Sequence, residues 1–144
     1  MSTATGALRP FTKVEVGSSL PELAIPLTRT LIVATALATR DFQDVHHDPA
    51  LAVERGSKDV FMNILTTNGL VGRFVTDWAG PQASLRRIAI RLGAPNYPGD
   101  VLTLSGEVIS NEAGVVTVKV RGANSLGDHV TGTVTVARAA GGVQ

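Results

Sequence analysis

Three long stretches in the second half of the chain alternate between apolar and polar residues. Residues 101–110, 116–121 and 129–136 place valine or leucine at alternate positions over most of their length, with polar residues between them. Alternation with a period of two is typical of β-strands that bury one face. In the last stretch, His129 falls on the polar face. The pattern therefore predicts three strands whose apolar faces share one core.

Turn sequences separate these stretches, and a further strand precedes them. The segment NEAG at residues 111–114 and the pair Gly127-Asp128 consist of residue types that favour tight turns. Neighbouring strands are therefore predicted to form antiparallel hairpins. Residues 85–92 are predicted to form another strand, and residues 96–100 (NYPGD) form the turn that follows it.

The longest helical pattern lies just before the strands. Apolar residues recur at helical spacing, namely Val60, Ile64, Leu65, Val71 and Val75. Ser57 or Asp59 is the expected N-cap, and the helix is predicted to run to about Trp78. Gly69 and Gly72 lie inside it, where each glycine costs about 1 kcal/mol relative to alanine. Such glycines indicate close packing against a sheet or, alternatively, room for a ligand.

Shorter elements are predicted in the first part of the chain. Residues 11–27 contain glycine and proline and are expected to form an irregular arm. Residues 28–33 are rich in β-branched residues and favour a strand, whereas residues 34–40 favour a short helix. A second short helix is expected over residues 49–56, with Asp48 as its N-cap.

This order of elements predicts a single α+β hot-dog fold, in which a curled antiparallel sheet wraps a long central helix. The fold is expected over residues 11–138 of the 144, a length that suits one domain. Residues 1–10 and 139–144 are small or polar and are predicted to be flexible tails. The exposed edge of such a sheet is expected to pair with a second subunit.

Composition narrows the function. The net charge is +1 and no dense cluster of lysine or arginine occurs, so nucleic-acid binding is not indicated. The chain has no cysteine, which excludes disulfides and thiolate chemistry. No signal-peptide pattern and no apolar run of about 20 residues is present. The expected location is the cytoplasm.

The candidate chemistry lies in the segment DFQDVHHD at residues 41–48, which holds two of the three histidines. An aspartate and a histidine that converge on one water molecule can add water to a double bond or remove it. Asp41 and His46 have this potential, although the spacing alone fits a polar turn as well. His47 is expected to face solvent and Asp44 to belong to a turn. A metal site is not expected, because consecutive residues converge poorly on one ion.

Two motifs resemble those of the MaoC-like, R-specific enoyl-CoA hydratases. The first is the run from Asp41 through His46 to Asp48-Pro49 and Ala52, which is similar to the family signature. The second is RLGAPNYPGDVL at residues 91–102, which resembles the strand and Pro-Gly-Asp turn after the hot-dog helix. The resemblance extends over about residues 14–138.

Within this family, the chain is most similar to the small subunits of the actinobacterial steroid side-chain enoyl-CoA hydratases. The similar segments are residues 36–48, 56–59, 75–81 and 126–130. The resemblance implies a catalytic subunit that hydrates a steroid side-chain acyl-CoA in cholesterol catabolism, without a cofactor. It also implies a larger partner subunit, in which a degenerate MaoC-like domain is fused to a DUF35-type domain that contacts an aldolase.

The resemblance also implies roles for individual residues. Asp41 would be the general base, His46 would orient the water, and the backbone N–H of Asn63 would stabilise the thioester oxygen. The chain departs from the family pattern at three places. Arg40 replaces a glycine, Gln43-Asp44 replaces Asn-Pro, and Met62-Asn63-Ile64 replaces His-Gly-Met.

Three alternatives remain open from the sequence. A dehydratase subunit of fatty-acid synthesis would use the same two residues on acyl-carrier-protein thioesters. A hot-dog thioesterase would need an acidic residue within the long helix, whereas Asp59 and Asp77 are expected at its two ends. A non-catalytic scaffold subunit is disfavoured by the intact pair of Asp41 and His46.

Overall fold

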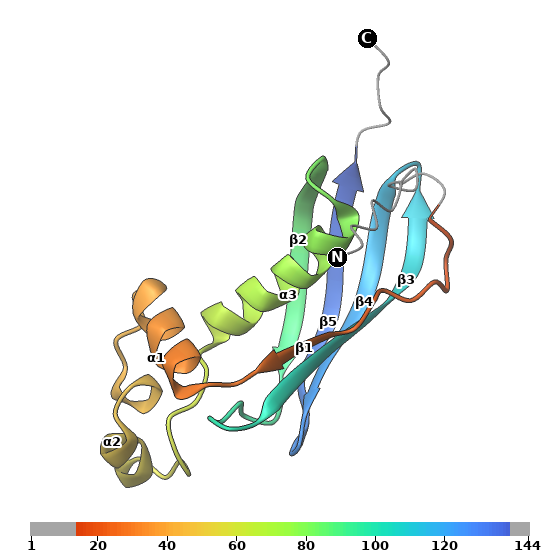
Figure 1. Cartoon of the computed structure of the whole chain (residues 1–144). Coiled ribbons are helices and arrows are strands. Elements are labelled where there is room, and N and C mark those ends of the chain that lie inside the picture. Colours follow the sequence, from red (N-terminus) through yellow and green to blue (C-terminus); the bar gives the residue numbers. More distant parts are fainter. Residues whose placement is uncertain (1–13, 139–144) are drawn as a thin grey trace, which may run out of the picture.

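The computed structural model describes residues 14–138, in which one long helix lies across an antiparallel sheet (Figure 1). The sheet has five strands in the order β1-β3-β4-β5-β2. Their bounds are Leu23–Pro26 (β1), Ala83–Leu92 (β2), Val101–Glu112 (β3), Val115–Asn124 (β4) and Gly127–Arg138 (β5). The predicted α+β arrangement is confirmed. The predicted tails at residues 1–10 and 139–144 lie outside the described residues.

The three alternating stretches form β3, β4 and β5, which pair as consecutive hairpins. The β3–β4 turn is at Ala113 and Gly114, which both have positive φ (53° and 90°), as the prediction placed it. The β4–β5 turn lies at Ser125 and Leu126 rather than at Gly127-Asp128. Next to this turn, a bulge between Gly122 and Ala123 shifts the pairing of β4 with β5 by one residue.

The long helix α3 spans Ile64–Ala79 and begins later than predicted. Its N-cap is Asn63, whose side chain accepts a hydrogen bond from the Thr66 N–H. The prediction of Ser57 or Asp59 was wrong. The Asp59 carboxylate instead binds the Arg29 guanidinium, at 2.8 and 2.9 Å.

The two glycines of α3 have different surroundings. A Cβ on Gly72 would lie 3.2 Å from Ile88 Cδ1 of β2, whereas a Cβ on Gly69 would meet nothing within 4 Å. Close packing against the sheet is therefore confirmed for Gly72 and wrong for Gly69, which is exposed.

The predicted strand at residues 28–33 was wrong, because these residues belong to helix α1, Arg29–Ala38. Thr28 caps α1 by accepting a hydrogen bond from the Leu31 N–H, and this local bond outweighs the β preference of the branched residues. The true strand β1 lies in the predicted irregular arm, at a sheet edge where proline is tolerated. Helix α2 (Pro49–Glu54) is capped by Asp48, as predicted.

Helix α3 and the sheet share one apolar core. Its members are buried valines, leucines and a phenylalanine, among them Leu102, Leu104, Val71, Phe74, Val75, Val118 and Val134. Helices α1 and α2 gather at the N-terminal end of α3 (Figure 1), so the segment between them lies against the start of that helix. Within residues 14–138, no helix is long and apolar enough to cross a membrane.

Candidate active site

The end of helix α1 determines where Asp41 lies. The Arg40 N–H donates to the Leu37 carbonyl and the Asp41 N–H to the Ala36 carbonyl, each at 3.0 Å. This is the hydrogen-bond pattern of a Schellman motif, whose residue after the C-cap adopts a left-handed conformation. That residue is Arg40, with φ of 58°. The left-handed turn directs the chain at Asp41 back toward α3, and it explains why glycine suits this position in the family pattern.

His46 ends a short 3₁₀ helix, Asp44–His46, and its side chain is 8 % exposed. Its Nδ1 lies 2.7 Å from the Phe61 carbonyl oxygen. A carbonyl only accepts hydrogen bonds, so Nδ1 carries a proton. In the neutral tautomer that this contact selects, Nε2 is an acceptor. The Phe61 ring packs edge-on against the imidazole, with centroids 4.9 Å apart. These two contacts hold the ring in place.

The two predicted site residues meet. Asp41 Oδ2 lies 3.3 Å from His46 Nε2, and the Asp41 side chain is 19 % exposed. Two donors approach the carboxylate, since the Gln43 N–H lies 3.4 Å from Oδ1 and Asn63 Nδ2 lies 3.2 Å from Oδ2. The result is a partly exposed carboxylate beside the second ring nitrogen of a buried imidazole.

A cavity of about 340 Å³ adjoins this pair. Its lining residues come from the segments before α3, from the start of α3, from the end of β2 and the loop after it, and from β5. They are Asp41, Gln43, His46, Phe61, Met62, Asn63, Ile64, Leu92, Gly93, Pro95 and His129. The wall is therefore largely apolar, with the polar groups gathered at the aspartate and the histidines. An apolar pocket with a few convergent polar groups is the usual form of a small-molecule site.

Asn63 stands at the N-terminus of α3 and lines the same cavity. Within residues 14–138, its backbone N–H donates to no backbone carbonyl. The N-terminal end of a helix favours negative charge, because the aligned peptide dipoles leave a partial positive charge at that end. The residue predicted as the oxyanion donor is thus brought beside Asp41 and His46.

Sequence reasoning missed His129, which was predicted on the polar face of a strand. It is 2 % exposed and lines the cavity. The pairing of β4 with β5 skips it, since Gly122 pairs with Val130 and Ala123 with Asp128. This bulge turns His129 to the helix side of the sheet, and nothing in the alternation of residues signals it.

His129 is held by two hydrogen bonds. Its Nδ1 lies 2.6 Å from the Ala94 carbonyl oxygen and its Nε2 lies 2.8 Å from Thr67 Oγ1. The carbonyl requires a proton on Nδ1, so the Thr67 hydroxyl donates to Nε2. Burial lowers the pKa of His129 below the usual 6.5, which the bond to Ala94 partly opposes.

His47 and Asp44 lie outside the cavity lining. His47 is exposed, as predicted, with its Nε2 3.2 Å from the Phe42 carbonyl oxygen. Asp44 pairs with Arg55, whose hydrogen bond lowers the pKa of the Asp44 carboxyl. In the described part of the chain, no three acidic, histidine or cysteine side chains gather as a metal site.

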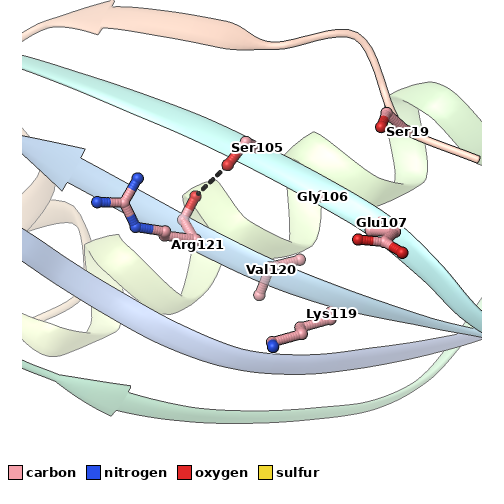
Figure 2. Close-up of a pocket in the computed structure, with 7 residues that line it drawn as sticks. All are labelled: Ser19, Ser105, Gly106, Glu107, Lys119, Val120 and Arg121. Atoms are coloured by element: carbon pink, nitrogen blue, oxygen red, sulfur yellow. Dashed lines mark hydrogen bonds between the residues drawn. The ribbon is translucent and has the colours of Figure 1, made fainter. Parts of the chain in front are cut away.

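A second hollow lies on β3 and β4 (Figure 2) and is polar and shallow. Its charged groups pair among neighbouring strands: Glu107 stands opposite Lys119 in the β3–β4 register, and Arg121 donates to Asp128 at 2.7 Å. Histidine is missing from its lining, and neither Asp41 nor Asn63 reaches it. The chemistry-bearing side chains therefore mark the cavity at Asp41 as the candidate site.

The fold and this pair define a class of protein. The model of the MaoC-like domain family matches residues 13–130, so the chain belongs to that family. It is 61 % identical, over 83 % of this chain and 92 % of the relative, to the 3-oxo-4,17-pregnadiene-20-carboxyl-CoA hydratase beta subunit of Mycobacterium tuberculosis.

Solved structures agree with this assignment. A chain in the crystal structure of the ChsH1-ChsH2 complex from Mycobacterium tuberculosis superimposes with a TM-score of 0.84 at 59 % identity, over 86 % of this chain and 98 % of that one. The (R)-hydratase from A. caviae involved in PHA biosynthesis shares the fold, with a TM-score of 0.77 at 22 % identity, over 88 % and 98 %. The predicted hot-dog fold is thereby confirmed.

Proposed function

We propose that this chain is the catalytic subunit of an enoyl-CoA hydratase, which adds water across the α,β double bond of an acyl-CoA thioester. The observation that carries the proposal is the proximity of Asp41 Oδ2 and His46 Nε2, which lie 3.3 Å apart at a largely apolar cavity. With its proton on Nδ1, the neutral imidazole presents Nε2 as an acceptor beside the acceptor Oδ2, and a water molecule has two hydrogens to give to them. Its oxygen lone pairs then remain available for attack.

The reaction follows from that arrangement. The water oxygen attacks Cβ of the substrate, a C–O bond forms, and Asp41 takes the water proton as general base. His46 orients the water through its Nε2. The electron pair of the double bond moves toward the thioester, whose oxygen gains negative charge beside the Asn63 N–H at the start of α3. One such backbone donor contributes about 3 kcal/mol to the transition state. Asp41 then returns the proton to Cα.

The nature of the substrate is inferred from similarity. At 61 % identity over most of both chains, the Mycobacterium tuberculosis beta subunit supports a steroid side-chain acyl-CoA as substrate, in cholesterol catabolism. The ChsH1-ChsH2 complex supports a heteromer, and we infer that the partner is a larger MaoC-like/DUF35 subunit. We infer further that an aldolase contacts this partner, that the reaction needs no cofactor, and that it takes place in the cytoplasm, where coenzyme A thioesters are made and used.

The test is an assay with an enoyl-CoA, for which we choose 3-oxo-4,17-pregnadiene-20-carboxyl-CoA. The chain is incubated with it alone and together with the larger subunit, while the absorbance of the conjugated thioester is followed. Loss of absorbance without free thiol is expected. Release of free coenzyme A would identify a thioesterase instead, and turnover of acyl-carrier-protein thioesters alone would identify a dehydratase of fatty-acid synthesis.

Two substitutions test the mechanism. Asp41→Asn and His46→Ala remove the base and the water-orienting acceptor, and each is expected to lower kcat by about 10² to 10⁴. His47→Ala is the matched control, because His47 is exposed and lies outside the cavity lining. Hydration that survives both active-site substitutions would rule out the proposed mechanism. A complex that is inactive with the wild-type chain would support a scaffold role.

A further inference from the structure

The side chain of Asn63 links the start of α3 to the end of α1 and to Asp41. Its Nδ2 donates to Asp41 Oδ2 at 3.2 Å and to Thr39 Oγ1 at 2.9 Å. Thr39 is in turn anchored, because its hydroxyl lies 2.8 Å from the Thr35 carbonyl oxygen of α1. The amide thus uses both of its hydrogens on groups from the segment that carries the catalytic carboxylate.

The direction of this amide is determined by helix α3. Asn63 Oδ1 accepts from the Thr66 N–H at 3.1 Å and from Thr66 Oγ1 at 2.5 Å, as an N-cap does. The oxygen therefore faces the helix, and the NH₂ group must face Asp41. Asn63 is 2 % exposed and Thr66 is 6 % exposed, so solvent does not compete for these bonds. The N-cap bonds to Thr66 determine the orientation of the Asn63 amide, and this amide in turn donates to the Asp41 carboxylate.

We propose that the Asn63 side chain is a positioning residue, which holds the Asp41 carboxylate turned toward His46. The proposal rests on the function proposed above. Asp41 ends a turn after α1 and is partly exposed, and its only other described donor is the Gln43 N–H at the longer distance of 3.4 Å. Without the amide, the carboxylate can rotate away from the water that it shares with His46. A misplacement of about 1 Å costs about 10²-fold in rate.

Two substitutions separate this role from helix capping. Asn63→Ser keeps an N-cap of equal quality but is too short to reach Asp41. Asn63→Asp keeps both the cap and the shape, but it sets an acceptor against the Asp41 carboxylate where the donor stood. Asn63→Ser preserves the cap without adding a buried charge, so we expect it to fold with a melting temperature lowered by no more than roughly 6 °C. Thr28→Ser, a cap exchange at the far end of α1, is the matched control.

The measurement is steady-state kinetics with 3-oxo-4,17-pregnadiene-20-carboxyl-CoA on the complex with the larger subunit. Both Asn63 variants are expected to lose about 10²-fold in kcat, with KM changed by less than about threefold. The control is expected to keep the wild-type kcat.

The outcomes distinguish the two proposals. Wild-type kcat in either folded Asn63 variant, or a loss confined to KM, would overturn the positioning role while Asp41→Asn stays inactive. An active Asp41→Asn would instead overturn the function on which the role rests.

Discussion

Replacing Arg40 with glycine is expected to give a more stable chain than replacing it with alanine. Arg40 holds φ of 58° in the Schellman motif that ends α1, and its side chain is exposed. At this φ a Cβ atom lies too close to the neighbouring carbonyl oxygen, whereas glycine has no Cβ. The hydrogen bonds of the motif use only backbone atoms of residues 36, 37, 40 and 41, so Arg40→Gly preserves them.

The size of the effect follows from opposing terms. The left-handed conformation costs a residue with a Cβ about 1–2 kcal/mol. Glycine relieves this cost, but it makes the unfolded chain more flexible, which lowers the stability by about 0.5–1 kcal/mol. The loss of a positive charge at the helix C-terminus removes about 0.3–1 kcal/mol more. Arg40→Ala loses the same charge but keeps the Cβ, so the glycine variant should exceed the alanine variant by about 0.5–1 kcal/mol.

Thermal or urea unfolding of the purified chain measures this difference. For a chain of this size, the glycine variant should melt about 1–4 °C above the alanine variant. Equal melting temperatures would show that residue 40 bears no backbone strain, and our account of how the motif orients Asp41 would then be wrong. Both variants lack the guanidinium of Arg40, so its loss does not contribute to the difference between their melting temperatures.

Two further predictions concern α3 and β5. Gly69→Ala should raise the free energy of unfolding of the chain alone by about 1 kcal/mol, because a methyl group there meets open space. Gly72→Ala should gain nothing, since its Cβ would crowd Ile88, and equal urea midpoints for the two variants would contradict the packing. The third prediction concerns His129, whose pKa is lower in the folded chain than in the unfolded chain. As the pH drops below about 6.5, the unfolded chain therefore binds a proton at this histidine more readily than the folded chain, and the free energy of unfolding falls. Chemical unfolding from pH 7.5 to 5 should show a smaller loss for His129→Gln than for the wild type, and parallel curves would argue against a buried neutral histidine.

Much of the fold could be predicted from local pattern. The strands of residues 101–138 follow from alternation, which records one buried face per strand. Helix α2 follows from Asp48 and Pro49, which favour a helix start wherever they occur together. The pair of Asp41 and His46 was also recognisable, because the five-residue spacing belongs to a known motif. Each of these patterns lies within one segment, so it can be recognised without knowledge of the rest of the chain.

Contacts between distant segments decided the remainder. Asp59 and Asn63 are both good N-caps, and the choice of Asn63 depends on Arg29, thirty residues before Asp59, which binds the Asp59 carboxylate. The bulge that turns His129 into the cavity exists only in the pairing of β5 with β4.

The candidate site likewise combines features that the local sequence determines with features that depend on contacts between distant segments. The sequence by itself determined which side chains carry the chemistry and which stretches form strands, because residue type and periodicity are local properties. Tertiary structure alone decided the distance of 3.3 Å between Asp41 and His46, the hydrogen bond from Asn63 to Asp41 and the position of His129 at the cavity. Each depends on packing α1, the start of α3 and β5 against one another, and no single segment contains that information.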